Sequence, residues 1–300
     1  MLAGLLLAGC GTGGSTGSAG GGSGDKGSVT IAAFNFNESA ILANMYAEVL
    51  KKAGYKVTVK SLTTREVVEP ALEKGDVDVV PEYLSTLTEF LNGKKNGPNP
   101  TPLASSDVDK TVSALKSLLE PKGVKVLTPS PATDQNAFAV TAKFATDNNL
   151  TTLSDLASYK GKLVLGGPSE CPKRPFCQLG LERTYGLKFT GFSSLDTGGP
   201  LTKTAIKNGK VQIGLVFSSD GGIEALGLKV LEDDKGLQNA DNVVPVVRSG
   251  KAKADLTAAL DKVSAALTTD ELVALNKKAD IDRQNPKQVA MDFLRSKGLI

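Results

Sequence analysis

Short apolar runs alternate with segments of helical spacing along most of the chain. The apolar run 28–33 predicts a strand, and the residues that follow it repeat on one face of a helix that ends at Gly54. The positions on that face are Ile41, Leu42, Met45, Tyr46, Val49 and Leu50. Alternating residues over 56–60 predict a second strand. The order strand, helix, strand is the unit of an α/β fold.

The same alternation continues to the end of the chain. One helix is predicted over 66–74 and is ended by Gly75, and another opens at Ser106-Asp107 and is ended by Gly123. Further strands are predicted over 77–80, 124–127, 137–141, 163–166, 211–217 and 243–247. The stretch 253–297 is mostly helical in pattern. The chain is therefore expected to be α/β, as one large domain or two modest ones.

The first residues do not follow this pattern. An apolar run from Leu2 to Ala8 is too short to span a bilayer, which takes about 20 apolar residues. It closes on small residues, as the end of a secretory signal does, and the missing basic n-region predicts that the given start lies inside that signal. Leu7-Ala8-Gly9-Cys10 resembles the bacterial lipobox, which implies a lipid on Cys10; an incidental Cys is the alternative.

Residues 11–27 are rich in Gly and Ser and are expected to be a flexible tether, so that folding begins near Ser28. Cys171 and Cys177 then remain as an even pair, six positions apart along the chain. An extracellular compartment permits a disulfide between them, and two free thiols are the alternative.

The amino-acid composition excludes several classes of function. Lys plus Arg is 35 and Asp plus Glu is 32, and the scattered basic residues indicate no nucleic-acid surface. The chain has no His, which removes His-based triads, His general bases and most zinc sites. Gly198-Gly199-Pro200 reads as a loop that opens a helix, without the Lys of a phosphate-binding loop. Asp76 and Asp78 read as solvated strand-edge residues. We expect no catalysis, no cofactor and no metal.

Four segments resemble the osmoprotectant-type substrate-binding proteins of ABC importers, which bind glycine betaine, choline or carnitine. The segments are Ala32-Ala33-Phe34-Asn35-Phe36-Asn37-Glu38, the stretch 71–86 with Pro81-Glu82-Tyr83, the turn Phe217-Ser218-Ser219-Asp220-Gly221 with Val230 to Asp234 after it, and the tail from Val289 to Ile300. Their order and spacing carry the resemblance, which spans nearly all of 28–300.

The resemblance implies a type II periplasmic-binding fold, in which two α/β lobes are joined by two crossover strands and the ligand lies in the cleft. We expect the first lobe at 28–134 plus 243–300 and the second at 135–242. The crossovers are expected near 133–137 and 242–244, with the C-terminal helices returning to the first lobe. Open α/β sheets bind ligands beyond the carboxyl ends of their strands, which directs attention to the loops that hold Asn35, Tyr83 and Asp220.

Residue by residue, Tyr83 and Thr86 match the family's cage tyrosine and its neighbouring threonine. An aromatic face attracts a quaternary ammonium ion that cannot be hydrogen-bonded. Glu170 and Arg174 match the acidic and basic residues of the family's second lobe, and an Arg fork can hold a ligand carboxylate. The alternatives are core packing for Tyr83 and a surface ion pair for Glu170 with Arg174.

The chain also departs from the family pattern. Phe34 stands where the family often has Lys, and Phe138, Phe217 and Asp241 stand where it has Tyr. The ring faces of Phe34, Tyr83, Phe138 and Phe217 predict a less polar cage, and plain packing is the alternative for each Phe. Asp134, Gln135, Asn136 and Asn242 are expected at the hinge, where they can hydrogen-bond a ligand with hydroxyls.

The expected function is capture of a quaternary-ammonium solute and its delivery to an ABC permease, by a monomer anchored through Cys10 on the extracellular face of the membrane or in the periplasm. One rival is the same role for a neutral aromatic or polyhydroxylated ligand. Another is a sensory lipoprotein with the same lobes, and an enzyme on this fold is the third.

Overall fold

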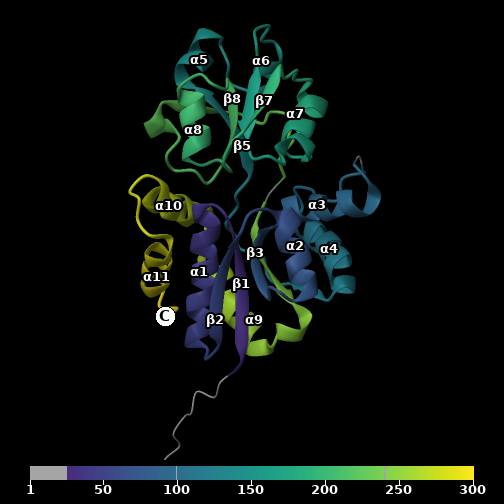
Figure 1. Ribbon diagram of the computed structural model, residues 1–300, viewed down its shortest axis with the longest axis vertical. Coiled ribbons are helices and arrows are strands. Elements are labelled where there is room, and N and C mark those ends of the chain that lie inside the picture. Colours follow the sequence, from purple (N-terminus) through teal and green to yellow (C-terminus); the bar gives the residue numbers. More distant parts are fainter. Residues whose placement is uncertain (1–25, 99, 240) are drawn as a thin grey trace, which may run out of the picture.

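The computed structural model describes residues 26–98, 100–239 and 241–300. The lower lobe in Figure 1 has the strands β1 (Ser28–Phe34), β2 (Lys56–Leu62), β3 (Val79–Tyr83), β4 (Val124–Val126) and β10 (Val243–Arg248). Its helices are α1 (Asn37–Lys52), α2 (Arg65–Lys74), α3 (Leu84–Asn96), α4 (Val108–Leu119), α9 (Ala254–Ala266), α10 (Thr269–Asp280) and α11 (Pro286–Ser296), with the short 3-10 helices η1 (Glu120–Lys122) and η4 (Ser249–Lys251). The C-terminal helices return to this first lobe, as expected.

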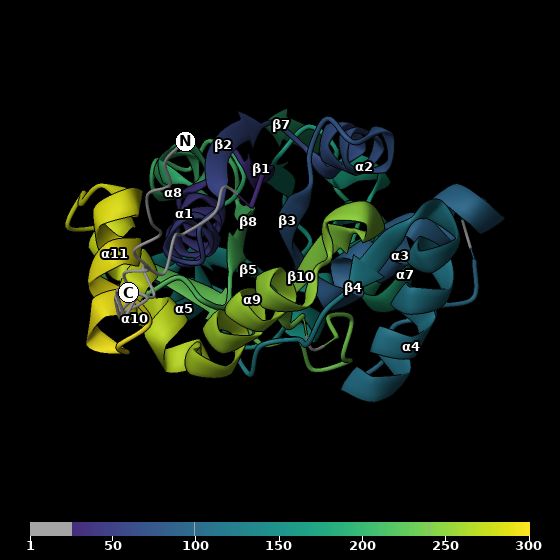
Figure 2. The same ribbon diagram turned by 90° about the horizontal axis from the view of Figure 1, so that it is seen from below.

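The first sheet has the strand order β2-β1-β3-β10-β4. Strand β1 runs parallel to β2 and β3, and β10 runs antiparallel to β3 and β4. Its central strands are apolar because helices cover both faces of the sheet: Figure 2 shows α1, α10 and α11 on one side and α3 and α4 on the opposite side. One continuous core joins β1, β3 and β10 to α1 and the C-terminal helices.

The second lobe holds the strands β5 (Asn136–Thr141), β6 (Val164–Gly167), β7 (Gly191–Ser194), β8 (Ile213–Phe217) and β9 (Leu228–Leu231), in the order β7-β6-β8-β5-β9. Its helices are α5 (Ala142–Asp147), α6 (Leu153–Ala157), α7 (Gln178–Tyr185) and α8 (Pro200–Lys207), with η2 (Cys171–Lys173) and η3 (Glu224–Leu226). Its apolar residues form two clusters. The two five-stranded sheets confirm the expected two-lobed α/β fold.

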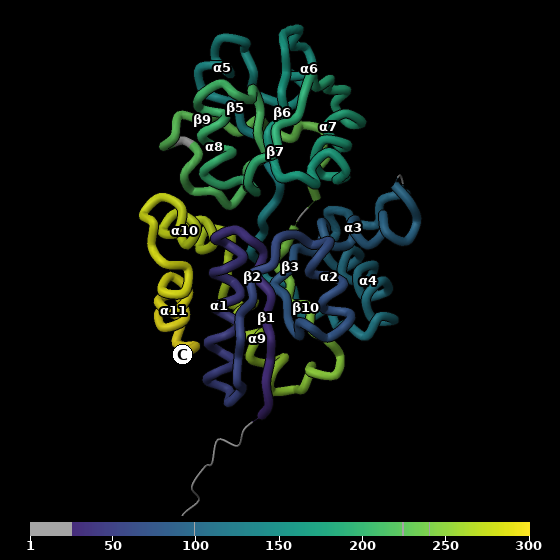
Figure 3. The backbone as a smooth tube through the Cα atoms, viewed as in Figure 1, coloured from purple at the N-terminus to yellow at the C-terminus, as the bar shows by residue number. Residues whose placement is uncertain are grey.

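Two chain segments cross between the lobes, and the backbone tube in Figure 3 shows them side by side in the waist of the molecule. Thr133 and Asn242 form an isolated antiparallel bridge there. Strand β5 enters the second sheet just after the first crossing, and β10 enters the first sheet just after the second. The bridge lies where the crossovers are expected, and the lobe limits 28–134 plus 243–300 and 135–242 stay a prediction.

The expected solvated position of Asp78 is wrong. Its side chain is 8% exposed, accepts a hydrogen bond from the backbone N–H of Thr30 at 2.9 Å, and pairs with Arg248 at 3.0 Å. Gly75 makes room for this pair: its φ is +86°, and a Cβ there would lie 2.8 Å from the Arg248 guanidinium. Asp78 is therefore a buried carboxylate that connects β1 to the end of β10 through its contacts with Thr30 and Arg248.

Most predicted elements are present, with ends shifted by a few residues. Strands β7 and β9 were not predicted, because neither is a continuous apolar run: β7 (GFSS) has Phe192 as its one large apolar residue, and Lys229 interrupts β9 (LKVL). The loop at Gly198-Gly199-Pro200 opens α8, as expected. Within the described ranges, no helix combines the length and apolar character needed to cross a membrane.

Candidate functional site

A cavity of about 100 Å³ lies between the two lobes. The first lobe contributes Phe34, Phe36, Arg65 and Tyr83 from the ends of its strands and the start of α2. The second lobe contributes the loop after β6, which carries Arg174, and Phe217 at the end of β8. This is the position that open α/β sheets use for ligands, beyond the carboxyl ends of their strands.

Phe36 is the central ring of the cavity. Its ring centroid lies 6.1 Å from that of Phe34, 6.3 Å from that of Tyr83 and 5.7 Å from that of Phe217. β1 ends at Phe34, and the chain then turns so that the Phe36 N–H donates to the Phe34 carbonyl at 2.9 Å; this turn brings the two rings to one wall. Phe217 comes from the other lobe, so the aromatic wall is assembled from both.

Tyr83 is held by a buried carboxyl group. Its hydroxyl donates to Glu38 at 2.6 Å, and the Ser219 hydroxyl in the second lobe donates to the other oxygen of Glu38 at 2.7 Å. Asn276 on α10 donates to the same carboxyl group. Burial raises the pKa of Glu38 and, together with the Glu38 charge, raises the pKa of Tyr83 well above its usual value. The Tyr83 ring is thus fixed in place as a wall of the cavity.

Asp241 lines the cavity and also caps α3. Its carboxylate accepts the backbone N–H groups of Ser85 at 2.7 Å and Thr86 at 3.1 Å, and the Thr86 hydroxyl donates to it as well. Carboxylates are favoured at this end of a helix because its N–H groups lack helical partners. Burial raises the pKa of Asp241 to about 6, against the lowering effect of the hydrogen bonds from Thr86 and the charge of Arg65. The Thr86 hydroxyl is therefore engaged by the protein itself.

Arg65 forms a buried ion pair with Glu82. The Arg65 Nε and Nη2 atoms lie 3.0 and 2.7 Å from the two Glu82 oxygens, and the side chains are 8% and 2% exposed. The guanidinium also lies 5.4 Å from the centroid of Phe34. Arg65 therefore places a cation against the ring of Phe34 at this wall.

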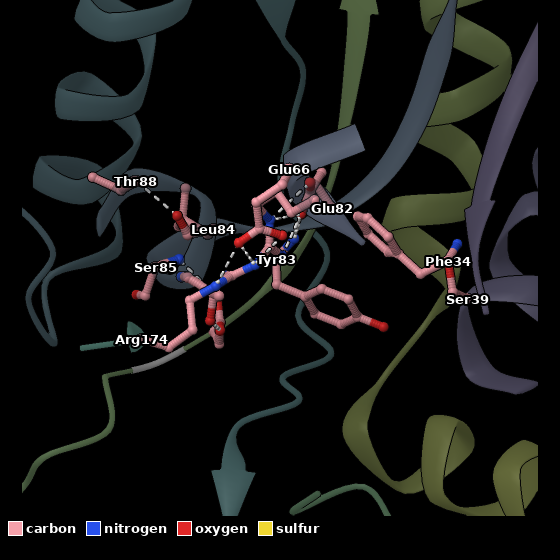
Figure 4. A network of polar contacts seen from close by, with 12 residues as sticks. Phe34, Ser39, Glu66, Glu82, Tyr83, Leu84, Ser85, Thr88 and Arg174 are labelled. Atoms are coloured by element: carbon pink, nitrogen blue, oxygen red, sulfur yellow. Dashed lines mark hydrogen bonds and ion pairs between the residues drawn. The ribbon is translucent and has the colours of Figure 1, made fainter. Parts of the chain in front are cut away.

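Arg174 pairs across the lobes, and not with Glu170. Its Nε and Nη2 atoms donate to the two Glu66 oxygens at 3.1 and 3.0 Å, which Figure 4 shows beside Glu82 and Tyr83. The guanidinium also lies 5.0 Å from the ring centroid of Phe90 on α3. Glu170 accepts a hydrogen bond from Ser169 at 3.2 Å and remains on the cavity wall. The alternative of a Glu170–Arg174 surface pair is therefore replaced by a bidentate contact between lobes.

The expected disulfide is confirmed. Cys171 and Cys177 are bonded, with their Cα atoms 5.2 Å apart, and both lie on the cavity wall. The bond closes the loop that carries Arg174 and Phe176, so it shapes the second-lobe side of the cavity.

The predicted site residues fall into three groups. The cavity brings together Phe34, Tyr83, Thr86, Asn136, Glu170, Arg174 and Phe217. Asn35 and Asp220 instead line a second, more polar hollow of about 160 Å³ on the other side of Phe36 and Phe217. Asp220 there forms a buried ion pair with Lys203.

Phe138, Gln135 and Asn242 do not line the cavity. Phe138 is 1% exposed in the core of the second lobe, which removes it from the expected cage. The Gln135 amide donates to the Asn239 carbonyl at 2.8 Å, and the Asn242 amide donates to the Ser130 carbonyl at 2.9 Å. The side-chain amides of these two residues bond backbone carbonyl groups near the crossovers. The expectation that they face the ligand is therefore wrong.

Sequence reasoning missed several cavity residues. Phe36, Arg65, Phe90 and Phe176 were not predicted, and Asp241 was noted only as a departure from the family, whereas Asp134, expected at the hinge, does line the cavity. Phe36 lies in the segment 32–38 that carries the family resemblance, and that segment is the signal that could have found it. No period links Phe90 or Phe176 to the cleft, because α3 and the disulfide loop meet there only through the packing of the lobes.

The chain matches one protein family over most of its length. The family described as the substrate-binding domain of the ABC-type glycine betaine transport system matches residues 27–296. The glycine betaine-binding protein YehZ of Escherichia coli is 29% identical over 87% of this chain and 88% of its own length. The carnitine transport binding protein OpuCC of Listeria monocytogenes is 27% identical over 91% and 88%.

Among solved structures, a glycine betaine/carnitine/choline ABC transporter chain superposes with a TM-score of 0.66 at 25% identity, over 90% of this chain and 99% of that one. A choline-binding protein in complex with choline superposes with a TM-score of 0.62 at 16% identity, over 90% of this chain and 89% of that one. It shares the type II two-lobed fold. The chain is therefore a binding protein and not an enzyme, and it belongs to the family of substrate-binding domains of ABC-type glycine betaine transport systems.

Proposed function

We propose that this protein captures a solute with a quaternary ammonium group in the aromatic cavity and delivers it to the permease of an ABC importer. The observation that carries the proposal is the position of Phe36 between Phe34, Tyr83 and Phe217. A cation over an aromatic face is stabilised by about 2 kcal/mol once both are desolvated. Methyl groups on nitrogen leave no N–H to hydrogen-bond, so ring faces are the partner that such a group needs.

Carboxyl groups add to the attraction of a cation. Asp241 and Glu170 lie on the cavity wall. An ionised carboxylate close to a bound cation lowers the free energy of that cation. The names of the similar proteins, which refer to glycine betaine and carnitine, point to the same class of solute.

Ligand capture in this proposal is coupled to closure of the lobes. The Phe36–Phe217 contact and the Arg174–Glu66 pair both join the lobes, with 28–134 plus 243–300 as one body and 135–242 as the other. A ligand that contacts both bodies favours the closed arrangement by its differential affinity. The closed form is then what the permease receives.

Calorimetric titration of the full chain with Cys10→Ser tests this function. Choline, glycine betaine and carnitine are compared with the neutral carbon isostere of choline, in which a tert-butyl group replaces trimethylammonium. Binding of at least one charged solute without binding of the isostere supports the proposal. Binding of the isostere or of neutral hydroxyl-bearing aromatics alone would contradict it and assign the cavity to the rival ligand class.

Anchoring through Cys10 is a separate part of the proposal, and Cys10 lies outside the described residues. It rests on Leu7-Ala8-Gly9-Cys10 and the Gly/Ser-rich residues after it. Detergent-phase partitioning of the chain expressed with a complete secretion signal is expected to place the wild type in the detergent phase and Cys10→Ser in the aqueous phase. Light scattering of the Cys10→Ser chain is expected to give a monomer.

A further inference from the structure

The second, polar hollow has walls from both lobes. Its first-lobe side comes from the residues after β1 and from α10, and its second-lobe side comes from the loops after β7 and β8. Figure 1 shows α8 directly above α10 on this side of the waist. Phe36, Thr197 and Phe217 line both this hollow and the aromatic cavity, and the rings of Phe36 and Phe217 lie between the two spaces. The second hollow is therefore a neighbour of the aromatic cavity and not a part of it.

The second hollow is large enough for a small molecule. Its volume is about 160 Å³. A protein cavity of about 150 Å³ can hold a molecule of the size of benzene. A solute of about six non-hydrogen atoms therefore fits this space.

Carboxyl groups dominate the wall of the second hollow. Asp196 and Asp220 contribute from the second lobe, and Glu38 and Asp280 contribute from the first. Among the described residues that line the hollow, none is Lys or Arg. Lys203 forms a buried ion pair with Asp220 but does not line the hollow itself. Because an ionised carboxylate lowers the free energy of a cation close to it, the hollow favours a positively charged ligand.

Asp280 offers this hollow an acceptor that the protein leaves open. Its Oδ1 atom accepts a hydrogen bond from the side-chain amide of Asn37 at 2.6 Å. Its Oδ2 atom has neither a hydrogen bond nor an ion pair with any residue in the described ranges. Asp196 differs, because its two oxygens accept the backbone N–H groups of Leu201 and Thr202 at 2.9 and 2.8 Å. The carboxylate of Asp280 is thus the one of these two that can receive a ligand.

Asn276 adds a buried acceptor without a donor. Its side chain lines the hollow, and the residue is 4% exposed. The Nδ2 atom donates to Glu38 and to the hydroxyl and carbonyl oxygens of Ser219. These bonds fix the orientation of the amide, and its Oδ1 atom then accepts no hydrogen bond from the part of the chain that the structure describes. An unpaired buried acceptor is costly, so a ligand that brings a donor is favoured here.

The ligand that fits these groups is a cation with N–H bonds. A primary ammonium group carries one positive charge and three N–H donors. A trimethylammonium group carries the same charge but has no N–H bond, so it can satisfy neither the open oxygen of Asp280 nor that of Asn276. The aromatic cavity and the second hollow therefore suit different kinds of ammonium group.

We propose that the second hollow is a separate binding site for a small primary ammonium ion, whose N–H groups donate to Asp280 and Asn276. This site goes beyond the proposed capture of a quaternary ammonium solute, because it lies on the other side of Phe36 and Phe217 and selects for hydrogen-bond donors.

Calorimetric titration of the Cys10→Ser chain with ethanolamine at pH 7 tests the second site. Ethanolamine is choline with three N–H bonds in place of its three methyl groups, so the two solutes differ only at nitrogen. We expect the chain to bind ethanolamine, and Asp280→Asn to weaken ethanolamine binding at least about tenfold while choline binding changes less than about twofold. Asp282→Asn is the matched control: Asp282 is exposed and does not line the hollow, and its replacement is expected to change neither affinity.

A competition titration shows which of the two spaces ethanolamine uses. Excess choline is expected not to displace ethanolamine, because choline belongs in the aromatic cavity. Displacement would place both solutes in the aromatic cavity and overturn the proposal. Circular dichroism checks that each variant is folded. If Asp280→Asn is not folded, Asn35→Leu repeats the measurement, because Asn35 is an exposed residue of the same hollow and its amide oxygen is then lost.

The outcomes keep this site apart from the proposed function. If ethanolamine does not bind, or if Asp280→Asn leaves its affinity unchanged, the second site is overturned while the quaternary-ammonium function stands. If ethanolamine binds with the expected dependence on Asp280 and no quaternary solute binds, the second site stands and the proposed function fails.

Discussion

The ring of Phe36 in the first lobe lies 5.7 Å from the ring of Phe217 in the second, with an angle of 26° between the ring planes. Offset contacts at this separation are favourable by themselves. The contact also means that the aromatic wall is complete only when the lobes are together. A ligand that needs both rings therefore stabilises the closed arrangement, and the same pair links recognition to closure.

Replacing Phe36 with Ala is expected to weaken choline binding about 30-fold, because an interaction of about 2 kcal/mol with the ring is lost. Calorimetry measures the change. Phe144→Ala is the matched control, since Phe144 packs against Tyr159 in the second lobe and does not line the cavity. An unchanged affinity in Phe36→Ala would show that the ligand does not use this ring.

Tyr83→Phe and Tyr83→Ala are expected to separate the two roles of Tyr83. The Phe variant keeps the ring but removes the hydroxyl that donates to Glu38, so the free energy of unfolding is expected to fall by about 1–2 kcal/mol with the affinity largely kept. The Ala variant is expected to lose affinity as well. Chemical denaturation and calorimetry give the two quantities, and equal affinity loss in both variants would assign ligand binding to the hydroxyl.

Choline binding is expected to depend on pH through Asp241. Burial raises the pKa of Asp241 to about 6 in the free protein, where it lies near Arg65 and Asp134 and accepts hydrogen bonds at the start of α3. A bound cation favours the ionised carboxylate and lowers this pKa, so binding releases a proton below about pH 6. Affinity is therefore expected to rise from about pH 5 to pH 7 and to level off above that.

Asp241→Asn is the control for this pH dependence. The amide oxygen of Asn keeps an acceptor for the backbone N–H groups of Ser85 and Thr86 but does not ionise. The slope between pH 5 and pH 7 is expected to flatten in this variant. A slope of the same size in Asp241→Asn would mean that another group titrates with the ligand.

Removing the disulfide is expected to affect both stability and binding. Replacing Cys171 and Cys177 together with Ser opens a short loop, and the chain-entropy model predicts a loss of about 2 kcal/mol in the free energy of unfolding. Because that loop carries Arg174 and Phe176 into the cavity, solute affinity is expected to fall as well. Reduction of the intact Cys10→Ser chain with dithiothreitol should reproduce both effects, and unchanged affinity would show that packing alone holds the loop.

The fold was largely predictable from local pattern. The helical spacing from Ile41 to Leu50 and the apolar run 28–33 predict α1 and β1, because one element must bury its apolar face against the other. Gly75 marks the end of α2, since the left-handed conformation there suits Gly. Strands β7 and β9 were not predicted, because the one has a single large apolar residue and the other is interrupted by Lys229.

The site was predictable only in part. A quartet of rings was expected, but the strand period does not say which rings face the cleft when both faces of a sheet are covered. Tertiary packing placed Phe138 in the core of the second lobe and Phe36 at the centre of the cavity. It also decided the partner of Arg174, since Glu66 is distant in sequence and belongs to the other lobe.

By itself, the sequence determined most of the order of strands and helices, the disulfide pair and the place of Tyr83 at the carboxyl side of a strand. These depend on local periodicity, on a short closed loop and on neighbouring residues along one strand. Only the tertiary structure decided the lining of the cavity and its charge pairing. Those depend on how two lobes, built from distant segments, meet across one cleft, because side-chain contacts between lobes leave no periodic signal in the chain.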